Sequence, residues 1–89
     1  MYSKEVEVIN KTGLHARPAS TFVQEAKKYK SKITITNTVN GKSGDAKSII
    51  KVLSLGMVKG TKIRLDGDGE DENLAIDSLV SLIESGFGE

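Results

Sequence analysis

The chain has 89 residues, a formal net charge of +1 and no cysteine. This length predicts a single domain over residues 1–89, and the lack of cysteine excludes disulfides, thiolate metal sites and thiol nucleophiles. The near-balanced charge and the scattered aromatic residues argue against a nucleic-acid binder. The sequence shows neither a signal peptide nor a segment of transmembrane length. We therefore expect a cytoplasmic protein that does not insert into membranes.

The first half of the chain passes from a strand pattern to a helix pattern and back. Polar and apolar residues alternate over 5–8, which predicts a half-buried strand, and the turn residues of 10–13 end it. Apolar residues then recur at helical spacing from Ala16 to about Tyr29. Pro18 falls in the first turn of this helix, where its missing N–H would have no intrahelical partner. Alternation over 32–36 predicts a second strand.

The second half repeats this succession of patterns. Asn40-Gly41 predicts a hairpin turn into a short partner strand. Residues 48–55 are expected to form a short helix, 61–66 a strand and 71–85 a closing helix, and a glycine follows each of the two helices. The order βαββαβα indicates an α+β open-faced sandwich. In it, three helices cover one face of a four-stranded, mostly antiparallel sheet.

His15, the only histidine, lies where a glycine-containing turn meets the first predicted helix. We expect its ring to be exposed and the main-chain N–H groups of Ala16 and Arg17 to lie beside it. A helix start favours an anion, and the Arg17 guanidinium suits phosphate oxygens. A neutral imidazole can act as a nucleophile. These residues predict a nucleophile beside an anion-binding site, and a surface capping histidine is the alternative.

Two segments carry a resemblance to a known family. Thr12-Gly13-Leu14-His15-Ala16-Arg17-Pro18-Ala19 resembles the active-site signature of HPr, the histidine-containing phosphocarrier family of the bacterial sugar phosphotransferase system. Residues 46–56 resemble the regulatory-serine segment of the same family. The likeness extends over essentially the whole chain, although the hairpin around residues 36–40 is slightly longer than is common in the family.

The resemblance implies a mechanism and a set of partners. His15 would accept a phosphoryl group from phosphorylated enzyme I, originally from phosphoenolpyruvate, and pass it to sugar-specific enzyme IIA domains. Arg17 would be the charge partner, and the family uses no metal or other cofactor in the carrier. Ser48 would be phosphorylated by an HPr kinase/phosphorylase, and the product would bind a catabolite-control transcription regulator. The protein would act as a monomeric carrier rather than as an enzyme.

A docking patch is expected on the helix predicted over 48–55. This helix holds more apolar residues than a short helix on a one-sided sheet can bury. The resemblance places the exposed apolar residues and a basic rim for acidic partners at Ile49, Ile50, Leu53, Lys27, Lys47 and Lys51. Core packing is the alternative, and for Ile50 the two are equally balanced. Ser48 is by its position an ordinary N-cap, which is compatible with a regulatory role.

Two other functions stay open at this stage. The first is a regulator with the same fold and serine but no transfer activity, and His15 argues against it. The second is a small α+β domain that binds a nucleic acid or a metabolite without phosphotransfer. Acid-labile phosphate after incubation with enzyme I and phosphoenolpyruvate would separate a carrier from both.

Overall fold

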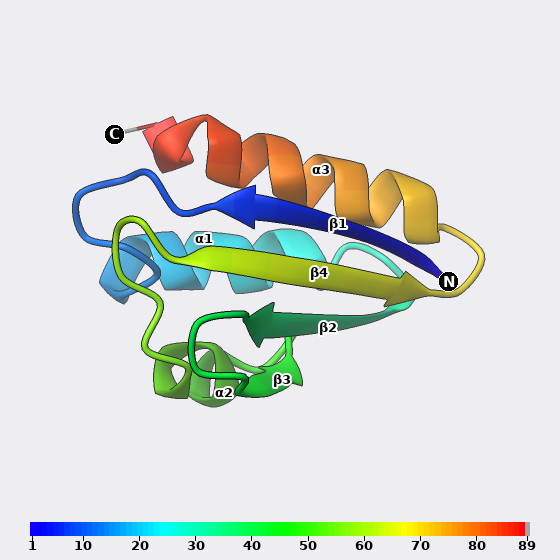
Figure 1. Cartoon of the computed structure of the whole chain (residues 1–89). Coiled ribbons are helices and arrows are strands. Elements are labelled where there is room, and N and C mark those ends of the chain that lie inside the picture. Colours follow the sequence, from blue (N-terminus) through cyan, green and yellow to red (C-terminus); the bar gives the residue numbers. More distant parts are fainter. Residues whose placement is uncertain (89) are drawn as a thin grey trace.

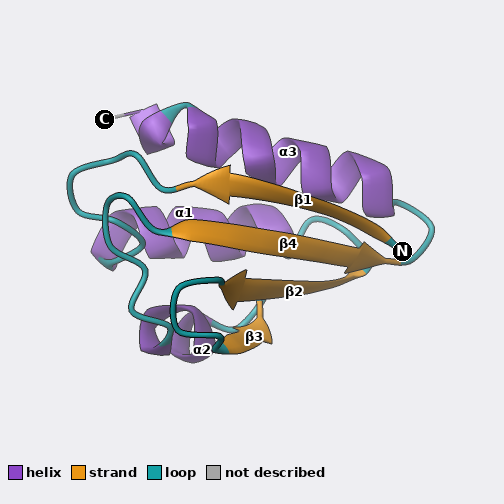
Figure 2. Cartoon of the chain, viewed as in Figure 1, coloured by secondary structure: helices purple, strands orange, loops and turns teal. Residues whose placement is uncertain are grey.

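The computed structural model describes residues 1–88 and confirms the predicted order of elements. In chain order these are β1 (Tyr2–Glu7), α1 (Ala16–Ala26), β2 (Lys32–Asn37), β3 (Ser43–Asp45), α2 (Ile49–Ser54), β4 (Lys62–Asp68), α3 (Glu72–Glu84) and a 3₁₀ turn (Gly86–Gly88) (Figures 1 and 2). The boundaries differ from the expected ones by a few residues. The largest difference in a helix is in α1, which ends at Ala26 rather than near Tyr29.

The four strands form one sheet in the order β1-β4-β2-β3, and every neighbouring pair is antiparallel. The register pairs Val6 with Ile63 and Ile35 with Leu65, and all four side chains are buried. The alternate residues of β1 and β4 are mostly exposed and mostly charged. The sheet therefore has one apolar face and one open polar face, as alternation along the strands predicts.

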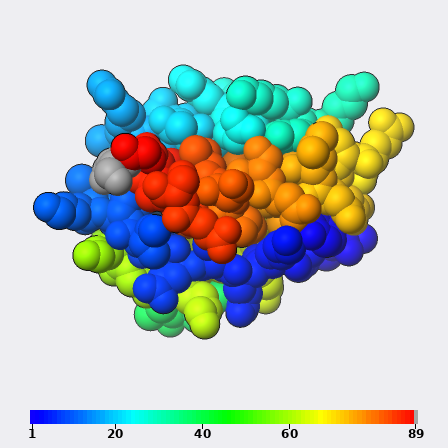
Figure 3. Space-filling view, turned by 90° about the horizontal axis from the view of Figure 1, so that it is seen from above, coloured from blue at the N-terminus to red at the C-terminus, as the bar shows by residue number. Residues whose placement is uncertain are grey.

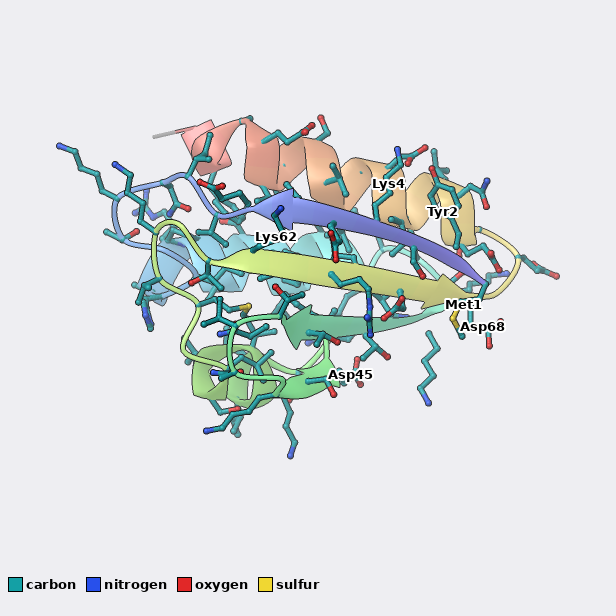
Figure 4. All side chains as sticks on the ribbon, viewed as in Figure 1. Met1, Tyr2, Lys4, Asp45, Lys62 and Asp68 are labelled. Atoms are coloured by element: carbon teal, nitrogen blue, oxygen red, sulfur yellow. The ribbon has the colours of Figure 1, made fainter. Side chains whose placement is uncertain are left out.

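The helices bury the apolar stripes that the sequence pattern indicated. Their buried residues include Ala19, Phe22, Val23, Ala26, Val52, Ile76, Leu79, Val80 and Ile83. Figure 3 shows α3 between β1 and α1. On the β1 side, Asp77 of α3 accepts a hydrogen bond from Tyr2 (2.7 Å) and pairs with the Lys4 ammonium (2.8 Å), and Figure 4 labels both β1 residues. Lys4 and then Tyr2 hold the pKa of the Asp77 carboxyl below its ordinary value.

A carboxylate fastens the loop before α3 to the loop before β2. Asp71 accepts hydrogen bonds from the main-chain N–H groups of Lys30 and Ser31, both at 2.9 Å, and from the Ser31 hydroxyl. Gly69 approaches the same loop so closely that a Cβ there would lie 2.6 Å from Ser31 Oγ. Two segments about forty residues apart in sequence are thereby joined at the end of the molecule where α3 begins (Figure 1). Within residues 1–88, no helix has both the length and the apolar character needed to cross a bilayer.

Replacing Asp71 with asparagine is expected to lower the free energy of unfolding at neutral pH. The free energy of unfolding of the variant should also change less than that of the wild type as the pH falls. The Ser31 hydroxyl and the Lys30 N–H lower the pKa of this carboxyl from 3.8 to about 2. Its stabilising contribution is therefore complete above about pH 4 and is lost as the pH falls through about 2. Urea denaturation from neutral pH to about pH 2 measures the effect. If the free energy of unfolding changed equally with pH in the wild type and the variant, the prediction would be contradicted.

Candidate functional site

The turn that precedes His15 is held by a buried asparagine. The Gly13 N–H donates to the Asn10 carbonyl (3.1 Å), and Asn10 Nδ2 donates to the Gly13 carbonyl (2.8 Å) and to Thr12 Oγ1 (3.3 Å). Asn10 is only 4% exposed, and its Oδ1 is buried without a partner. The sequence predicts Asn10 only as part of a turn, because its side-chain hydrogen bonds depend on the three-dimensional arrangement of the turn.

The same turn is anchored to the segment that follows α2. Gly13 has a left-handed φ of +66°, and a Cβ there would collide with the Met57 carbonyl and lie 2.8 Å from Val58 Cα. Glycine is the residue that tolerates both conditions. The N–H of the buried Leu14 donates to the Met57 carbonyl at 2.9 Å. The position of His15 is thus set by contact with the segment that follows α2 as well as by its own turn.

His15 is the exposed residue immediately before α1, with extended φ and ψ angles of −129° and 157°. No side chain caps the helix, and its first turn has no acidic residue. The main-chain N–H groups of Ala16 and Arg17 belong to exposed residues at the positively polarised end of the helix. Ala16 has a left-handed φ of +52°, which costs an alanine about 1–2 kcal/mol. Such strain is often found at functional positions.

Arg17 is exposed beside His15 in the first turn of α1. Within residues 1–88 its guanidinium forms no ion pair with a carboxylate. His15, Ala16 and Arg17 together present one imidazole, two N–H donors and one guanidinium to solvent. This arrangement can hold a covalently attached phosphoryl group, because the donors and the charge match its oxygens.

The short helix α2 exposes the three apolar residues that the sequence analysis selected. Ile49 is 39% exposed, Ile50 76% and Leu53 41%, whereas Val52 and Leu55 are buried. The core-packing alternative for Ile50 is therefore wrong. The three exposed side chains lie on the part of α2 that faces away from the sheet, because the buried pair takes the face toward the core.

The three lysines expected around this patch differ in their surroundings. Lys27 is exposed at the C-terminal end of α1, and Lys51 is exposed on α2 with its stem against Gly44. Lys47 is half-buried, and its Nζ donates to the Tyr29 carbonyl at 2.7 Å. Lys47 thus ties the start of α2 to the loop after α1, so it is less free than the other two to meet a partner.

Ser48 is the N-cap of α2, as its sequence position predicted. Its Oγ accepts a long hydrogen bond from the Lys51 N–H (3.4 Å), and its own N–H donates to the Asp45 carbonyl (3.1 Å). The link to the His15 turn leaves from the opposite end of α2, at Met57. The six residues of α2 rise about 9 Å, so a group on Ser48 lies beside the exposed apolar residues and away from His15.

The described part of the chain contains no cluster of three or more His, Cys, Asp or Glu side chains that could hold a metal ion. Its only histidine is His15. At the candidate site, the imidazole of His15 has main-chain N–H donors and the guanidinium of Arg17 beside it.

The chain is similar to known phosphocarrier proteins over nearly its whole length. The family described as "PTS HPr component phosphorylation site" matches residues 2–85. The phosphocarrier protein HPr of Haemophilus influenzae is 51% identical over 83 residues, which cover 93% of this chain and 95% of that protein. The crystal structure of HPr-C-His from Thermoanaerobacter tengcongensis is 48% identical and has a TM-score of 0.96, covering 100% of this chain and 98% of that one.

A more distant solved structure carries a regulatory description. The Bacillus subtilis catabolite repression protein Crh, described as a swapped, intertwined dimer, is 41% identical with a TM-score of 0.75 and a coverage of 97% of both chains. The matches to the family and to the Haemophilus relative cover nearly the full length and include the segment around His15. The protein therefore belongs to the HPr family, the phosphocarrier component of the phosphotransferase system, and is a carrier rather than an enzyme.

Proposed function

We propose that His15 accepts a phosphoryl group from phosphorylated enzyme I and passes it to enzyme IIA domains. The observation that carries this proposal is the exposed imidazole directly before an uncapped helix start, with Arg17 beside it. Family membership supports the same role. We place the exchange in the cytoplasm, with enzyme I and enzyme IIA domains as the protein partners.

In the proposed step, the Nδ1 lone pair of neutral His15 attacks the phosphorus atom held by enzyme I. A P–N bond forms as the bond to the donor breaks, and the donor keeps its bonding electron pair. The N–H groups of Ala16 and Arg17 and the Arg17 guanidinium stabilise the charge on the phosphoryl oxygens. Transfer to an acceptor reverses these events and returns the imidazole to its neutral form.

The test of this function uses enzyme I, radiolabelled phosphoenolpyruvate and the full chain. The expected product is a phosphoprotein whose label is lost in acid and kept in base, as is typical of phosphohistidine. The label should leave when an enzyme IIA domain is added. Absence of any label would contradict the carrier function and favour either the purely regulatory protein or the binding domain.

We assign the docking surface for enzyme I to the α2 patch, which consists of Ile49, Ile50 and Leu53 with Lys27 and Lys51 at its rim. Exposed apolar residues next to lysines that form no ion pair within residues 1–88 fit a partner that presents carboxylates around an apolar contact. Lys47 contributes mainly through its bond to the Tyr29 carbonyl. The segment that follows α2 is bonded to the His15 turn at Met57, and this bond supports a partner that covers the patch and the imidazole together.

Replacing Ile49 with aspartate is expected to raise the KM of enzyme I for this protein by about 10-fold, because it puts a negative charge against acidic groups. The free energy of unfolding should change by less than about 1 kcal/mol, since the side chain is 39% exposed. Initial rates of phosphorylation and thermal denaturation measure the two effects. Leu74→Asp, at an exposed position of α3, is the matched control. A large loss of stability would instead place Ile49 in the core.

We further propose that Ser48 is phosphorylated by an HPr kinase/phosphorylase and that the modified protein binds a catabolite-control transcription regulator. The support is the N-cap position of the half-buried Ser48 directly before the exposed Ile49, and the likeness to Crh, whose description names catabolite repression. We propose a monomer as the working form. A swapped dimer like that described for Crh would appear as a doubled mass in sedimentation equilibrium.

A further inference from the structure

The tip of the β2–β3 hairpin presents an apolar side chain to solvent. Val39 is 78% exposed. The phosphoryl transfer proposed at His15 does not involve its side chain. An exposed valine on a mobile loop would need no explanation. The main chain around Val39, however, is hydrogen-bonded to two other elements of the fold.

The first attachment is to the C-terminal end of α2. Asn37 is only 2% exposed; its Nδ2 donates to the Leu55 carbonyl at 2.8 Å, and its Oδ1 accepts from the Val39 N–H at 2.9 Å. Asn40 Nδ2 donates to the same Leu55 carbonyl at 3.3 Å. Two amide side chains, one on each side of Val39, thus fasten the tip to α2.

The second attachment is to the start of β4, where Figure 4 labels Lys62. The Thr38 N–H and hydroxyl both donate to the Lys62 carbonyl, at 3.1 and 2.6 Å. The turn is closed by the Gly41 N–H, which donates to the Asn37 carbonyl at 2.8 Å. Because the backbone is already ordered, a partner that contacts Val39 pays little conformational entropy to do so.

The tip lies at the end of the molecule that carries the functional site. The Leu55 carbonyl that holds the tip is two residues from Met57, whose carbonyl accepts from the Leu14 N–H next to His15. Figure 1 shows the β2–β3 connection at the same end as the loop between β1 and α1. A partner that covers the α2 patch and reaches His15 can therefore also meet the tip.

The charges around the tip indicate the chemistry of that partner. Residues 8–62 hold eleven of the thirteen Lys and Arg residues but only two of the twelve Asp and Glu residues. Lys42 is exposed in the hairpin itself and Lys51 is exposed on α2, and neither of them pairs with a carboxylate within the described chain. An apolar contact surrounded by unpaired ammonium groups fits a protein surface rich in carboxylates.

We propose that Val39, with Lys42, forms a second docking element that contacts the acidic surface of enzyme I next to the α2 patch. This inference rests on the proposed function, because it takes enzyme I as the phosphoryl donor. The tip fixes the orientation of the docked partner, since it contacts the partner at a second place, beside the C-terminal end of α2. The tip therefore affects the binding of enzyme I and not the rate of the chemical step at His15.

The test compares Val39→Asp and Val39→Ala with the wild type in the phosphorylation of the full chain by enzyme I. Val39→Asp should raise KM about 10-fold through charge repulsion, and Val39→Ala about 3-fold through lost apolar contact, with kcat unchanged in both. Leu74→Asp makes the same change at a residue that is 66% exposed on α3, near the opposite end of the molecule, and should leave KM unchanged. All three variants should keep the wild-type melting temperature to within about 2 °C.

A wild-type KM for Val39→Asp would overturn the docking role of the tip, and so would equal increases for Val39→Asp and Leu74→Asp. A second readout separates this inference from the proposed function. Titration of isotope-labelled wild-type protein with unphosphorylated enzyme I should shift the amide resonances of residues 38–41. Unshifted tip resonances overturn the inference even if transfer occurs, whereas failure of His15 to accept phosphate while the tip shifts contradicts the transfer function alone.

Discussion

His15→Ala is expected to accept no phosphoryl group from enzyme I while keeping the fold of the wild type. The imidazole supplies the only nitrogen nucleophile of its kind in the chain, so its removal ends the covalent step. The side chain is exposed and makes no capping hydrogen bond. The free energy of unfolding should therefore change by less than about 0.5 kcal/mol.

Incorporation of label from phosphoenolpyruvate and thermal denaturation check the two parts of this prediction. Gln24→Ala, at an exposed polar position further along α1, is the matched control and should be labelled like the wild type. Full labelling of the His15 variant at another residue would move the phosphorylation site elsewhere. A variant that is both unlabelled and unfolded would instead give His15 a structural role.

Phosphorylation of Ser48 is expected to slow the transfer from enzyme I to His15 by about 100-fold. The phosphate adds a charge of about −1.5 to −2 at neutral pH, directly before the exposed Ile49. Placing like charges against each other in an interface costs several kcal/mol. A cost of about 2.7 kcal/mol corresponds to the expected 100-fold effect. The site lies at the end of α2 remote from the His15 turn. The effect should therefore appear in KM more than in kcat.

Initial rates with enzymatically phosphorylated protein measure this inhibition. Ser48→Ala loses only the long 3.4 Å cap and should transfer at nearly the wild-type rate, with a loss of about 0.5–1 kcal/mol in stability. Ser48→Asp carries less charge and fewer acceptor oxygens, so its effect should be weaker than that of the phosphate. Equal rates for phosphorylated and unmodified protein would leave Ser48 as a helix cap only.

Features set by neighbouring residues could be predicted from the sequence. Alternation along the strands and helical spacing in 16–26 and 72–84 depend on which side chains share a face, and this follows from local geometry. The pairing of Asn40-Gly41 with a short following strand is equally local. The adjacency of His15, Ala16 and Arg17 at a helix start also follows from consecutive residues. The sequence therefore determined the sheet, the helices and the composition of the candidate site.

Tertiary structure alone decided the features that join distant segments. Whether Ile50 is buried depends on how α2 rotates against the sheet, and both orientations satisfy the same apolar pattern. Gly13 contacts Met57, and Asp71 bonds to the loop at residues 30–31. Each of these contacts links segments that are forty or more residues apart in the sequence. The fastening of the hairpin tip through Asn37 to Leu55 is of the same kind. A sequence pattern reports only periodicity along the chain, whereas these contacts arise when separate elements pack around a shared core.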